Sequence, residues 1–408
     1  MIPLDDAWAH VHDAVPRLPV ATVTVPDALG LVLAAPVVAT AAVPPFDNSA
    51  VDGFAVRAAD VTAPGTELPV VGEVAAGAVA QGPLEPGGAV RIMTGAPMPD
   101  GADAVVMVED SEVVRSADGT ERVRLSVVPG RHRHVRPAGD DVRPGDLVLE
   151  SGTVLGEAHL GLLATLGRAE VEVHRRPVVG VLSTGDELVP PGRPLAPGQI
   201  HDSNRVTLLA LCRSAGFDAV DLGLLGDDEA PLESALLDAA ARCDAVLTSG
   251  GVSMGDHDPV KAVLARIARM RWMQVAIKPA KPFAFGLLDG PAGRPVPVFG
   301  LPGNPVSSQV SFELFARPGI RVMGEHPSPH RPRVAARAGE AFARRADGKV
   351  HFVRVRLSQD GGLGFVATSA GAQGSHQLSG MAAADGLAVL PDGAGAAVGD
   401  RLEVLLLR

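Results

Sequence analysis

The sequence predicts a multidomain α/β protein in which a parallel-sheet domain lies between β-rich regions. The chain has 408 residues, a length that suits about two to four domains. From residue 177 onward, strand-like apolar runs alternate with helix-like segments, the pattern of a parallel sheet with right-handed crossovers. Residues 61–130 and 327–408 instead hold short β-like runs punctuated by Gly and Pro, which is typical of all-β domains such as a small barrel or sandwich.

Composition and charge restrict the function. The net charge is −11, which argues against a general nucleic-acid binder with a basic face. Aromatic residues make up 3% of the chain and tyrosine is absent, so base-stacking surfaces are not expected. No apolar run is long enough for a membrane span, and the acidic N-terminus lacks a signal-peptide pattern. We therefore expect a cytoplasmic protein that binds neither nucleic acid nor membrane.

The stretch before residue 147 predicts one helix and several polar turns. Residues 4–16 place apolar side chains at helical spacing. Residues 47–49, Asp-Asn-Ser, follow two prolines and can bond to the local backbone, so a structured turn and a ligand loop explain them equally well. Residues 91–97 form a strand that runs into a polar turn. The Arg-rich and Asp-rich residues 131–146 are expected to be a solvated connector.

The second half of the chain predicts the sheet and its helices. Strand-like runs occupy 178–182, 219–225, 244–248, 272–277, 283–287 and 296–299. Helices are expected at 204–215, after Asp227 and Asp228, at 259–270 and at 306–316. Polar or Gly-rich loops follow four of the strands, at 183–188, 249–258, 278–282 and 300–305. Because ligands of parallel sheets bind at the carboxyl ends of the strands, these four loops are expected to form one site.

The loop at 249–258 has the sequence SGGVSMGDHD. Its glycines and serines would expose backbone N–H groups at the start of a helix, where anions such as phosphate bind. A tight turn capped by Asp258, with Pro259 at the first helical position, is the simpler explanation of the loop alone. Its place among four loops at one sheet edge favours a functional site.

The predicted rim carries both cations and carboxylates. Lys278 and Lys281 are followed by prolines that restrict the backbone, which suits binding of phosphate or another oxyanion. Ser375 and His376 are expected to be surface residues, because no acid completes a triad with them. Five acidic residues could supply oxygen ligands to Mg²⁺: Asp186, Glu187, Asp202, Asp256 and Asp258. The residues alone therefore predict that the protein handles a phosphorylated small molecule with Mg²⁺.

Seven motifs occur in order along nearly the whole chain. They are PPFDNSAVDGFAVR (44–57), RIMTGAPMPDGADAVVMVE (91–109), STGDEL (183–188), GQIHDSN (198–204), SGGVSMGDHD (249–258), AIKPAKPFAFG (276–286) and GLPGNPVS (300–307). Together they resemble the MoeA family of molybdopterin molybdenumtransferases, which is related to the E domain of gephyrin. The resemblance implies that adenylylated molybdopterin and molybdate bind, that the diphosphate bond is cleaved with a divalent cation such as Mg²⁺, and that molybdenum cofactor and AMP are released.

The resemblance also implies the organisation of the protein. The expected parts are an N-terminal and linking domain (1–43 and 141–175), an inserted β-rich domain (44–140), an α/β molybdopterin-binding domain (176–326) and a C-terminal β-barrel domain (327–408). An elongated homodimer is implied, with the active cleft between the α/β domain of one subunit and the β insertion of the other. A molybdopterin adenylyltransferase and apo-molybdoenzymes are possible further partners.

The family's functional positions carry over residue by residue. Catalytic roles are implied for Asp52, Thr94, Asp141, Glu187, Asp202 and Asp258, and the last three are also the implied metal ligands. Substrate binding is implied for Asp47, Asn48, Ser49, Gly95, Ser183, Thr184, Gly185, Asp186, Ser249, Gly250, Gly251, Ser253, Lys278, Lys281, Pro302, Gly303, Asn304 and Pro305.

The sequence departs from the family pattern at several places, of which the replacements at Val51 and Phe54, for the usual Met and Tyr, are conservative. The family usually has glycine where this chain has Ala280, so a positive φ there would strain the alanine by about 1 kcal/mol. The usual GED segment appears as Gly139-Asp140-Asp141, which makes the role of Asp141 less direct.

Two alternative functions remain open from the sequence. Molybdopterin adenylyltransferases share the α/β domain but typically carry a GGTG signature, whereas this chain has Gly250-Gly251-Val252-Ser253. A gephyrin-like scaffold without enzyme activity is the other alternative. The sequence does not distinguish molybdate from tungstate.

Overall fold

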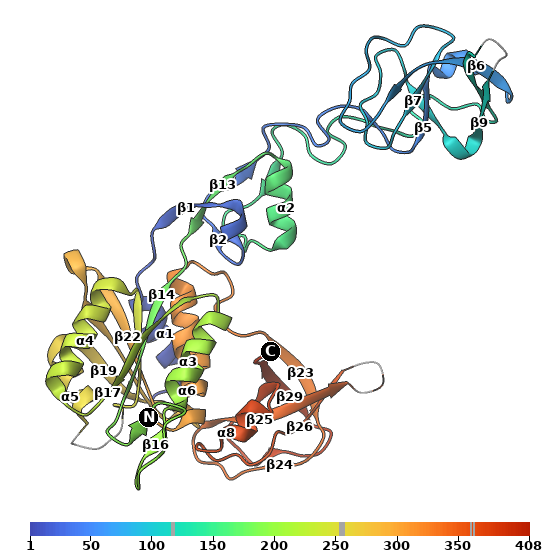
Figure 1. The fold of residues 1–408 in the computed structure, drawn as a ribbon. Coiled ribbons are helices and arrows are strands. Elements are labelled where there is room, and N and C mark those ends of the chain that lie inside the picture. The colour runs from blue at the N-terminus through green and yellow to red at the C-terminus, as the bar shows by residue number, and fades with distance from the viewer. Residues whose placement is uncertain (116–118, 253–257, 360, 362–363) are drawn as a thin grey trace.

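The protein is elongated, with four parts arranged along its length. The structure, a computed structural model, describes residues 1–115, 119–252, 258–359, 361 and 364–408. Figure 1 shows the α/β domain and the C-terminal barrel side by side at one end. The inserted β domain lies at the other end, and a small linking domain lies between them.

The α/β domain is built on a six-stranded sheet in the order β17-β14-β18-β22-β21-β19. Its strands are β14 (Val178–Thr184), β17 (Asp218–Leu225), β18 (Ala245–Ser249), β19 (Ala268–Gln274), β21 (Pro282–Asp289) and β22 (Pro295–Leu301). The first four strands in the spatial order are parallel, as the sequence predicted. Strand β21 runs antiparallel to both of its neighbours, β22 and β19. Strand β19 is therefore parallel to β22, and the loop after β19 leaves the sheet at the same edge as the loops after β14, β18 and β22.

Helices cover both faces of this sheet (Figure 1). They are α1 (Leu4–Ala14), α3 (Ser203–Ser214), α4 (Glu229–Arg242), α5 (Pro259–Ile267), α6 (Pro305–Ser311) and α7 (Arg317–Met323), with a π-helical segment, Phe312–Ala316, between the last two. An apolar core on one face joins side chains of α1, α3 and α6 to the sheet, and a second core on the other face joins α4 and α5. The side chains of Asp202, Asp228 and Asp258 each accept a backbone N–H at the start of a helix. This confirms the predicted helix starts at Asp228 and Asp258.

Two elements differ from the sequence-based expectation. Helix α1 was expected in the linking domain, but Ala7 and Val11 are buried in the core of the α/β domain. The helix expected over residues 259–270 ends at Ile267, because Ala268–Gln274 pair with β21 as a strand. In both cases a long-range partner decides the outcome, and local periodicity does not reveal such a partner.

The remaining domains are mostly β-structure, as predicted. The inserted domain contains the six-stranded sheet β8-β5-β7-β6-β10-β9, formed by β5 (Gly53–Val56), β6 (Thr66–Val74), β7 (Ala89–Ile92), β8 (Ala104–Met107), β9 (Ser111–Arg115) and β10 (Glu121–Leu125), with the small pair β4 (Asn48–Ser49) and β11 (Val135–Arg136) beside it. The linking domain comprises β1 (Val20–Thr24), β2 (Val32–Leu33), β3 (Val37–Val38), β12 (Leu147–Leu149), α2 (Glu157–Thr165) and β13 (Glu170–His174).

The C-terminal domain is a closed barrel rather than a sandwich. Its strands are β23 (Arg333–Ala338), β25 (Val350–Gln359), β26 (Phe365–Ser369), β27 (Gly386–Leu390) and β29 (Arg401–Leu406), followed in space as β25-β26-β23-β29-β27, with β27 pairing back to β25. Short elements complete the chain: β15 (Leu188–Val189), β16 (Ile200–His201), β20 (Ile277–Lys278), β24 (Phe342–Ala343), α8 (Leu378–Ala382) and β28 (Gly395–Ala396). Strand β20 pairs with β25 and so joins the α/β domain to the barrel.

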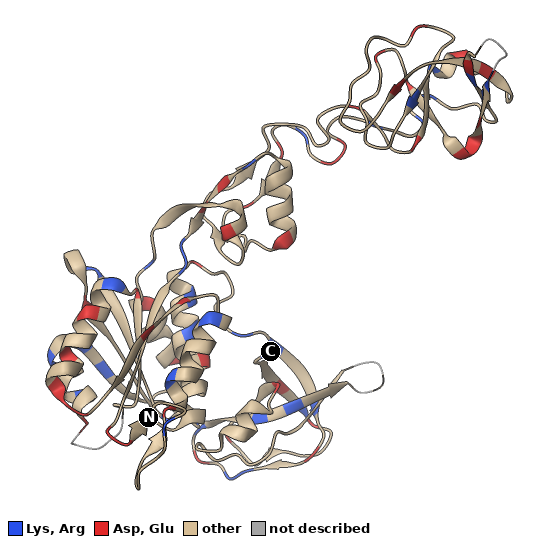
Figure 2. Cartoon of the chain, in the orientation of Figure 1, with Lys and Arg blue, Asp and Glu red and all other residues tan. Residues whose placement is uncertain are grey.

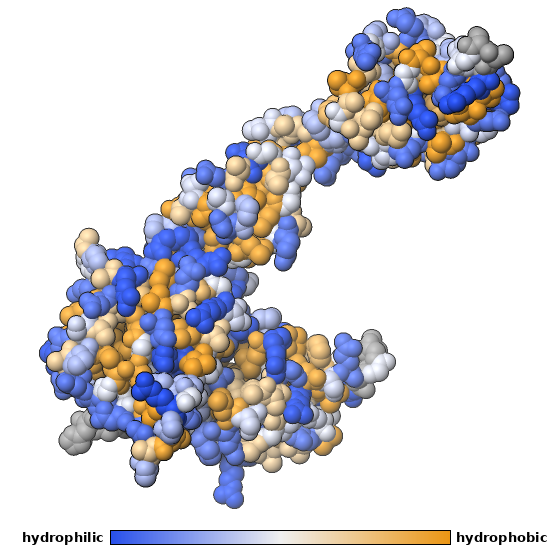
Figure 3. All heavy atoms as spheres, viewed as in Figure 1, coloured by the Kyte–Doolittle hydropathy of each residue, from blue (hydrophilic) through white to orange (hydrophobic). Residues whose placement is uncertain are grey.

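The surface mixes charged and apolar residues along the whole molecule. Figure 2 shows acidic and basic residues interspersed along the ribbon of all four parts. Figure 3 shows apolar residues on the visible face of the linking domain as well as of the larger domains. Among the described residues, no helix combines the length and the hydropathy needed to cross a lipid bilayer.

Candidate functional site

A cavity of about 750 Å³ opens at the sheet edge where β14, β18 and β22 end. Three of the four predicted loops meet there, and Pro282 represents the fourth. The described residues that line it are Thr184, Glu187, Leu188, Ile200, His201, Asp202, Ser203, Asn204, Ser249, Gly250, Gly251, Val252, Pro282, Pro302, Gly303, Asn304, Pro305, His376 and Leu378. The loops that were predicted to share one rim therefore lie together, because the strands before them end at the same edge of the sheet.

The loop after β18 brings its backbone to the cavity. Gly250 and Gly251 have φ angles of +100° and +77°, a conformation that favours glycine. The Gly250 N–H donates to the Leu301 carbonyl at 3.0 Å, which ties this loop to the end of β22. A Cβ on Gly251 would lie 2.3 Å from the Cβ of Val260, so no larger residue fits there. Ser253 and Asp256 lie outside the described residues.

Asn204 connects three of the rim segments. Its Nδ2 donates to Ser249 Oγ at 2.8 Å and to the Gly303 carbonyl at 2.7 Å. The sequence placed Asn204 in a motif without giving it a role. Its position just after the helix cap Asp202 was the available signal, because the first turn of a helix at a sheet edge faces the ligand side.

Asp202 is held in a buried ion pair. Its side chain is 1% exposed, Oδ2 accepts from Arg205 Nε at 2.9 Å, and Oδ1 accepts from the Arg205 N–H and from Ser183 Oγ, both at 3.1 Å. Arg205 also pairs with Asp221 at 2.5 Å. Asp202 therefore caps α3 and fixes its first turn, while Arg205 and Ser183 occupy part of the bonding capacity of its carboxylate.

The other predicted carboxylates point in different directions. Glu187 is exposed and lines the cavity. Asp186 Oδ1 accepts from the Asp227 N–H at 3.1 Å and so faces the loop before α4. Asp258 Oδ1 caps α5 by accepting from the Lys261 N–H at 3.3 Å, and its side chain is not part of the lining. In the part of the chain that the structure describes, no three metal-ligating side chains form a cluster.

The Lys-Pro-Ala-Lys-Pro loop, residues 278–282, lies beside the cavity. Lys278 and Lys281 are exposed and do not line it. Ala280 has a φ angle of +72° and is 3% exposed, so this position has the positive φ that glycine would adopt without strain. The sequence left open whether residue 280 has a positive φ angle. The structure shows that it has, so the alanine is in the strained conformation.

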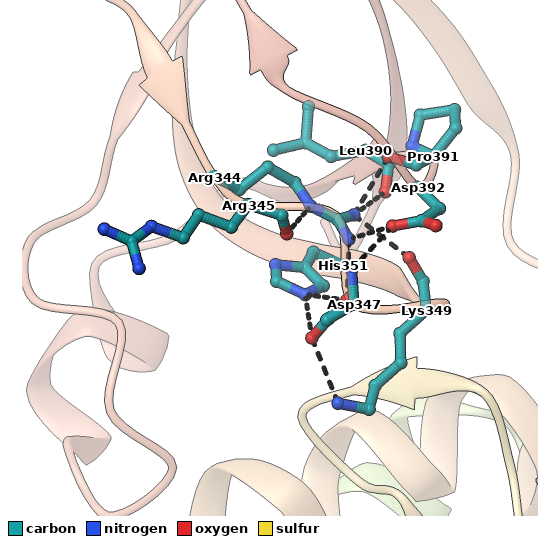
Figure 4. A network of polar contacts seen from close by, with 8 residues as sticks. All are labelled: Arg344, Arg345, Asp347, Lys349, His351, Leu390, Pro391 and Asp392. Atoms are coloured by element: carbon teal, nitrogen blue, oxygen red, sulfur yellow. Dashed lines mark hydrogen bonds and ion pairs between the residues drawn. The ribbon is translucent and has the colours of Figure 1, made fainter.

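A polar network supports this loop from the barrel (Figure 4). Lys278 lies opposite His351 in the β20–β25 ladder. The buried guanidinium of Arg344 donates to the carbonyls of Lys349 and Leu390 and pairs with Asp347 and Asp392. His351 and Lys349 also contact Asp347, whose pKa is lowered to about 2 mainly by the bond from Lys349. The start of β25, and through it the position of Lys278, is fixed by these contacts.

The predicted site residues of the inserted domain form a separate group. Asp52 Oδ1 accepts from the Thr94 N–H at 2.7 Å and from Thr94 Oγ1 at 2.8 Å, and the backbone bond in particular lowers the pKa of Asp52. Gly95 donates its N–H to the Ser49 carbonyl, and Asp47 Oδ1 accepts from the Ala138 N–H at 2.7 Å.

Two residues of this group stand out. The side chain of Asn48 is 6% exposed, and its Oδ1 has no hydrogen-bond partner among the described residues. The exposed Asp141 donates its backbone N–H to the Val43 carbonyl at the junction with the linking domain. Within one chain the inserted domain, which holds the group apart from Asp141, lies at the far end of the molecule from the α/β domain (Figure 1).

His376 is exposed, as the sequence predicted. It also lines the cavity from the barrel side together with Leu378, which the sequence did not predict. No local sequence pattern predicts that His376 lines the cavity, because the approach of the barrel loop to α6 depends on the packing of two domains.

The fold and the cavity define a multidomain α/β protein with a candidate small-molecule site at the carboxyl edge of its parallel strands. The chain is 41% identical over 384 residues to the molybdopterin molybdenumtransferase of Haemophilus influenzae, covering 93% of this chain and 92% of that protein. It therefore belongs to the MoeA family, the molybdopterin molybdenumtransferases of molybdenum cofactor biosynthesis.

Other comparisons agree over the whole length. Molybdopterin molybdenumtransferase 2 of Mycobacterium tuberculosis is 40% identical over 394 residues, covering 94% of each chain. Family models match at residues 2–167 (MoeA N-terminal region, domain I and II), 180–322 (probable molybdopterin binding domain) and 335–407 (MoeA C-terminal region, domain IV). The crystal structure of the molybdopterin biosynthesis moeA protein from Pyrococcus horikosii superposes with a TM-score of 0.79 at 31% identity, covering 100% of this chain and 99% of that one.

Proposed function

We propose that this protein binds adenylylated molybdopterin and molybdate in the cavity, cleaves the diphosphate linkage, and releases AMP and molybdenum cofactor in the cytoplasm. The observation that carries the proposal is the Gly250-Gly251 backbone, which faces the cavity at a position where Val260 excludes any side chain. The Gly250 N–H is bonded to the Leu301 carbonyl, so the Gly251 N–H is the backbone donor of this pair that would suit a phosphate group. Glu187 lies on the same cavity and provides the carboxylate that a metal-bound phosphate needs.

The residues present fit a magnesium site only in part. Mg²⁺ commonly uses one or two protein carboxylates and takes its other ligands from substrate phosphates and water. The exposed Glu187 lines the cavity and suits such a role, whereas Asp258 caps α5 outside the described lining and Asp202 is bonded to Arg205. When bound, the ion would supply charge neutralisation at the diphosphate.

The protein's own groups would orient the substrate. Asn204 holds the loops of Ser249 and Gly303 at a fixed separation, so the phosphate cradle is formed before the substrate arrives. Pro302 and Pro305 restrict the loop that contains Gly303 and Asn304. Lys278 and Lys281 lie beside the opening and would attract the anionic substrate and molybdate.

The group around Asp52 and Thr94 would act in the cavity of a second subunit. This proposal explains why ligand-like residues gather on the inserted domain far from the cavity of their own chain. The exposed apolar side chains of Val20, Leu29, Val38 and Leu147 on the linking domain could be covered in a homodimer.

Mixing two inactive variants tests this arrangement. Asp52→Ala and Glu187→Ala would each abolish AMP release from homodimers, and in mixed dimers one of the two sites would be intact. Denaturing and refolding an equal mixture should recover about a quarter of the wild-type rate, since about half of the dimers are mixed and each has one intact site. No recovery from a mixture that refolds into dimers would contradict a shared site.

The reaction itself is tested by measuring AMP. With adenylylated molybdopterin, Mg²⁺ and molybdate, the wild-type protein should release AMP, and omission of molybdate should leave molybdenum cofactor unformed. A competition between molybdate and tungstate in the same assay would establish which oxyanion is used. Failure to release AMP under conditions in which the substrate is bound would refute the proposed reaction.

A further inference from the structure

A second cavity, of about 50 Å³, lies where the linking domain meets the α/β domain. On the linking-domain side it is lined by residues 30–32 and by the end of β13, and on the α/β side by the last turn of α7 and the segments that follow α3 and α7. No described residue lines both this cavity and the one at the sheet edge, which contacts the opposite end of α3. The two cavities are therefore separate sites.

The polar side chains that line this cavity are all basic: His174, Arg175, Arg321 and His326. None of the described lining residues is Asp or Glu. The volume leaves room for several oxygen atoms, because about 10 to 15 Å³ accommodates one water molecule. A small anion is the ligand that such a set of donors suits.

Arg321 has no acidic partner in the part of the chain that the structure describes. Its Nε is buried without a hydrogen-bond partner, and its Nη2 contacts Nε2 of His326. Burial and the nearby charge of Arg331 lower the pKa of Arg321. A buried guanidinium without a partner is unfavourable, so a negative charge in the cavity would stabilise it.

His326 directs a donor to the same place. Its Nδ1 accepts from the Ser328 N–H at 3.0 Å, so the proton of the neutral imidazole is on Nε2. Burial, together with Arg321 and Arg317, lowers the pKa of His326 to about 4, which keeps the ring neutral at pH 7. The Nε2–H group and Arg321 Nη2 are therefore two donors that face each other, and an acceptor beside both would satisfy them.

Nearby acidic side chains are already paired with other arginines. Glu313, in the π-helical segment before α7, accepts from Arg331 Nε at 2.8 Å and from its Nη2 at 3.0 Å. Glu325, which follows α7, pairs with Arg17 at 2.9 Å. Neither carboxylate is free to pair with Arg321.

Asp244 is engaged in the same way beside Arg175. It is 3% exposed and accepts from both Nη atoms of Arg175 and from Arg294 Nη1, each at 2.5 Å. Positive charge therefore exceeds negative charge around this cavity, although the whole chain carries a net charge of −11. A local excess of this kind attracts anions.

His174 adds an unpaired group from the linking domain. Its Nδ1 is buried and has no hydrogen-bond partner among the described residues. The carbonyls at the two helix ends are bonded to backbone groups: the Phe217 N–H donates to the Cys212 carbonyl, and the His326 N–H donates to the Arg321 carbonyl, both at 3.0 Å. The side-chain donors of the cavity are therefore left for a ligand.

We propose that this cavity is a binding site for one small tetrahedral oxyanion, of the class of inorganic phosphate, sulfate and molybdate, and that Arg321, His326 and His174 hold it. The site is independent of the reaction proposed for the sheet edge. Because His174 belongs to β13 and Arg321 to α7, the bound oxyanion would connect the linking domain to the α/β domain and stabilise their junction.

Equilibrium dialysis with radiolabelled phosphate at constant ionic strength tests the binding. We expect one phosphate per chain at this cavity, with a Kd of about 1 mM or lower, in addition to any phosphate at the sheet edge. Arg321→Met should raise the Kd of this site by about 10- to 100-fold, because it removes charge-assisted hydrogen bonds. Arg345→Gln, which removes an exposed positive charge from the barrel, is the matched control and should leave the Kd unchanged. Competition by unlabelled sulfate and molybdate identifies the oxyanion that the site prefers.

Two variants of His174 test the contribution of the linking domain. His174→Ala should raise the Kd for phosphate by about tenfold. His174→Asn should retain most of the affinity, because its amide nitrogen can take the place of Nδ1.

Thermal unfolding separates a ligand site from a structural role of Arg321. Without oxyanion, Arg321→Met should be at least as stable as the wild type, because it removes a buried charge that lacks a partner. Saturating phosphate should raise the Tm of the wild type by about 1 to 3 °C more than that of Arg321→Met, and the rise common to both proteins measures the general salt effect.

Equal phosphate binding by the wild type and Arg321→Met would overturn the proposal, as would a loss of stability in Arg321→Met that is the same with and without phosphate. If Arg321→Met does not fold, Arg321→Lys, which keeps the charge but has fewer donors, takes its place in the dialysis. Unchanged phosphate binding in both Arg321→Lys and His174→Ala would then overturn the proposal.

Discussion

Asp202 Oδ2 accepts a hydrogen bond from Arg205 Nε at 2.9 Å, beneath the rim of the cavity. The pair is almost fully buried and also caps α3. The family resemblance implied that Asp202 and Glu187 both ligate a metal, whereas the geometry gives them different environments. Both carboxylates line the cavity, but Asp202 is buried and bonded to Arg205 and Ser183, whereas Glu187 is exposed.

We predict that variants of these two residues separate stability from metal dependence. Glu187→Gln should raise the Mg²⁺ concentration needed for half-maximal AMP release by about tenfold with little loss of stability. Asp202→Asn should lower the free energy of unfolding by about 2 kcal/mol, because it removes one charge of a buried pair, and should leave the Mg²⁺ requirement of the folded fraction unchanged. Urea unfolding and Mg²⁺ titrations measure the two effects. A large shift of the Mg²⁺ requirement in Asp202→Asn would contradict this assignment.

The second prediction concerns Gly251. Replacement by alanine places a Cβ 2.3 Å from the Cβ of Val260 at a φ of +77°, so Gly251→Ala should lower the free energy of unfolding by more than about 2 kcal/mol and abolish AMP release. Gly303→Ala is the control, because its added Cβ meets no protein atom within 4 Å. Gly303→Ala should have the stability of the wild type. Its affinity for the substrate should fall only if the substrate contacts the backbone at residue 303. Equal stability losses in the two variants would show that the clash at Gly251 is relieved by movement.

The third prediction concerns Ala280. Its positive φ costs about 1 kcal/mol, whereas removing its buried methyl group costs a similar amount. Ala280→Gly should therefore change the free energy of unfolding by less than about 1 kcal/mol, since the two effects offset each other. Ala284→Gly, in the neighbouring strand β21, also loses a buried methyl group but relieves no strain, so it should cost about 1 to 2 kcal/mol. Equal losses in the two variants, compared by urea unfolding, would mean that the alanine at 280 is not strained.

Acidification should destabilise the protein. Burial, together with Arg321 and Arg317, lowers the pKa of His326 to about 4, compared with 6.5 for the ordinary imidazole. As the pH falls through 6.5, the unfolded chain takes up a proton that the folded protein does not yet bind, so the free energy of unfolding falls between pH 6.5 and about 4. The pKa values of His10, His12, His330 and His351 are lowered as well, mainly by burial, and act in the same direction.

Urea midpoints at several pH values measure this effect. After allowance for solvent screening, His326 should account for about 1 kcal/mol of the loss at low pH, so His326→Asn should flatten the pH profile by about that amount. The exposed His132→Asn is the control and should leave the profile as it is. A wild-type profile that rises on acidification would contradict the predicted sign.

Much of the rim could be predicted because it depends on local order along the chain. Strands followed by polar loops place Ser249, Gly250 and Gly303 at one sheet edge whatever the details of packing. The aspartate caps at Asp228 and Asp258 are also local, since cap and acceptor lie within the first turn. The four-domain division of the chain stays a prediction, apart from α1, which packs with the α/β core.

The parts that sequence missed depend on distant contacts. His376 reaches the cavity where the barrel packs against the α/β domain, and there the Val306 N–H donates to the Ser375 carbonyl, about 70 residues away in the chain. The Asp202–Arg205 contact is local by comparison, because side chains three residues apart are neighbours on a helix. The metal role that the family resemblance implies for Asp202 stays a prediction.

The central claim, that the cavity at the sheet edge transfers molybdenum into adenylylated molybdopterin, is tested most directly by comparing two incubations of the wild-type protein. One contains adenylylated molybdopterin, Mg²⁺ and molybdate, and the other contains molybdopterin, Mg²⁺ and ATP. We predict that AMP and molybdenum cofactor appear in the first incubation and that ATP remains unchanged in the second. Consumption of ATP with free molybdopterin, without AMP release in the first incubation, would contradict the account and indicate an adenylyltransferase.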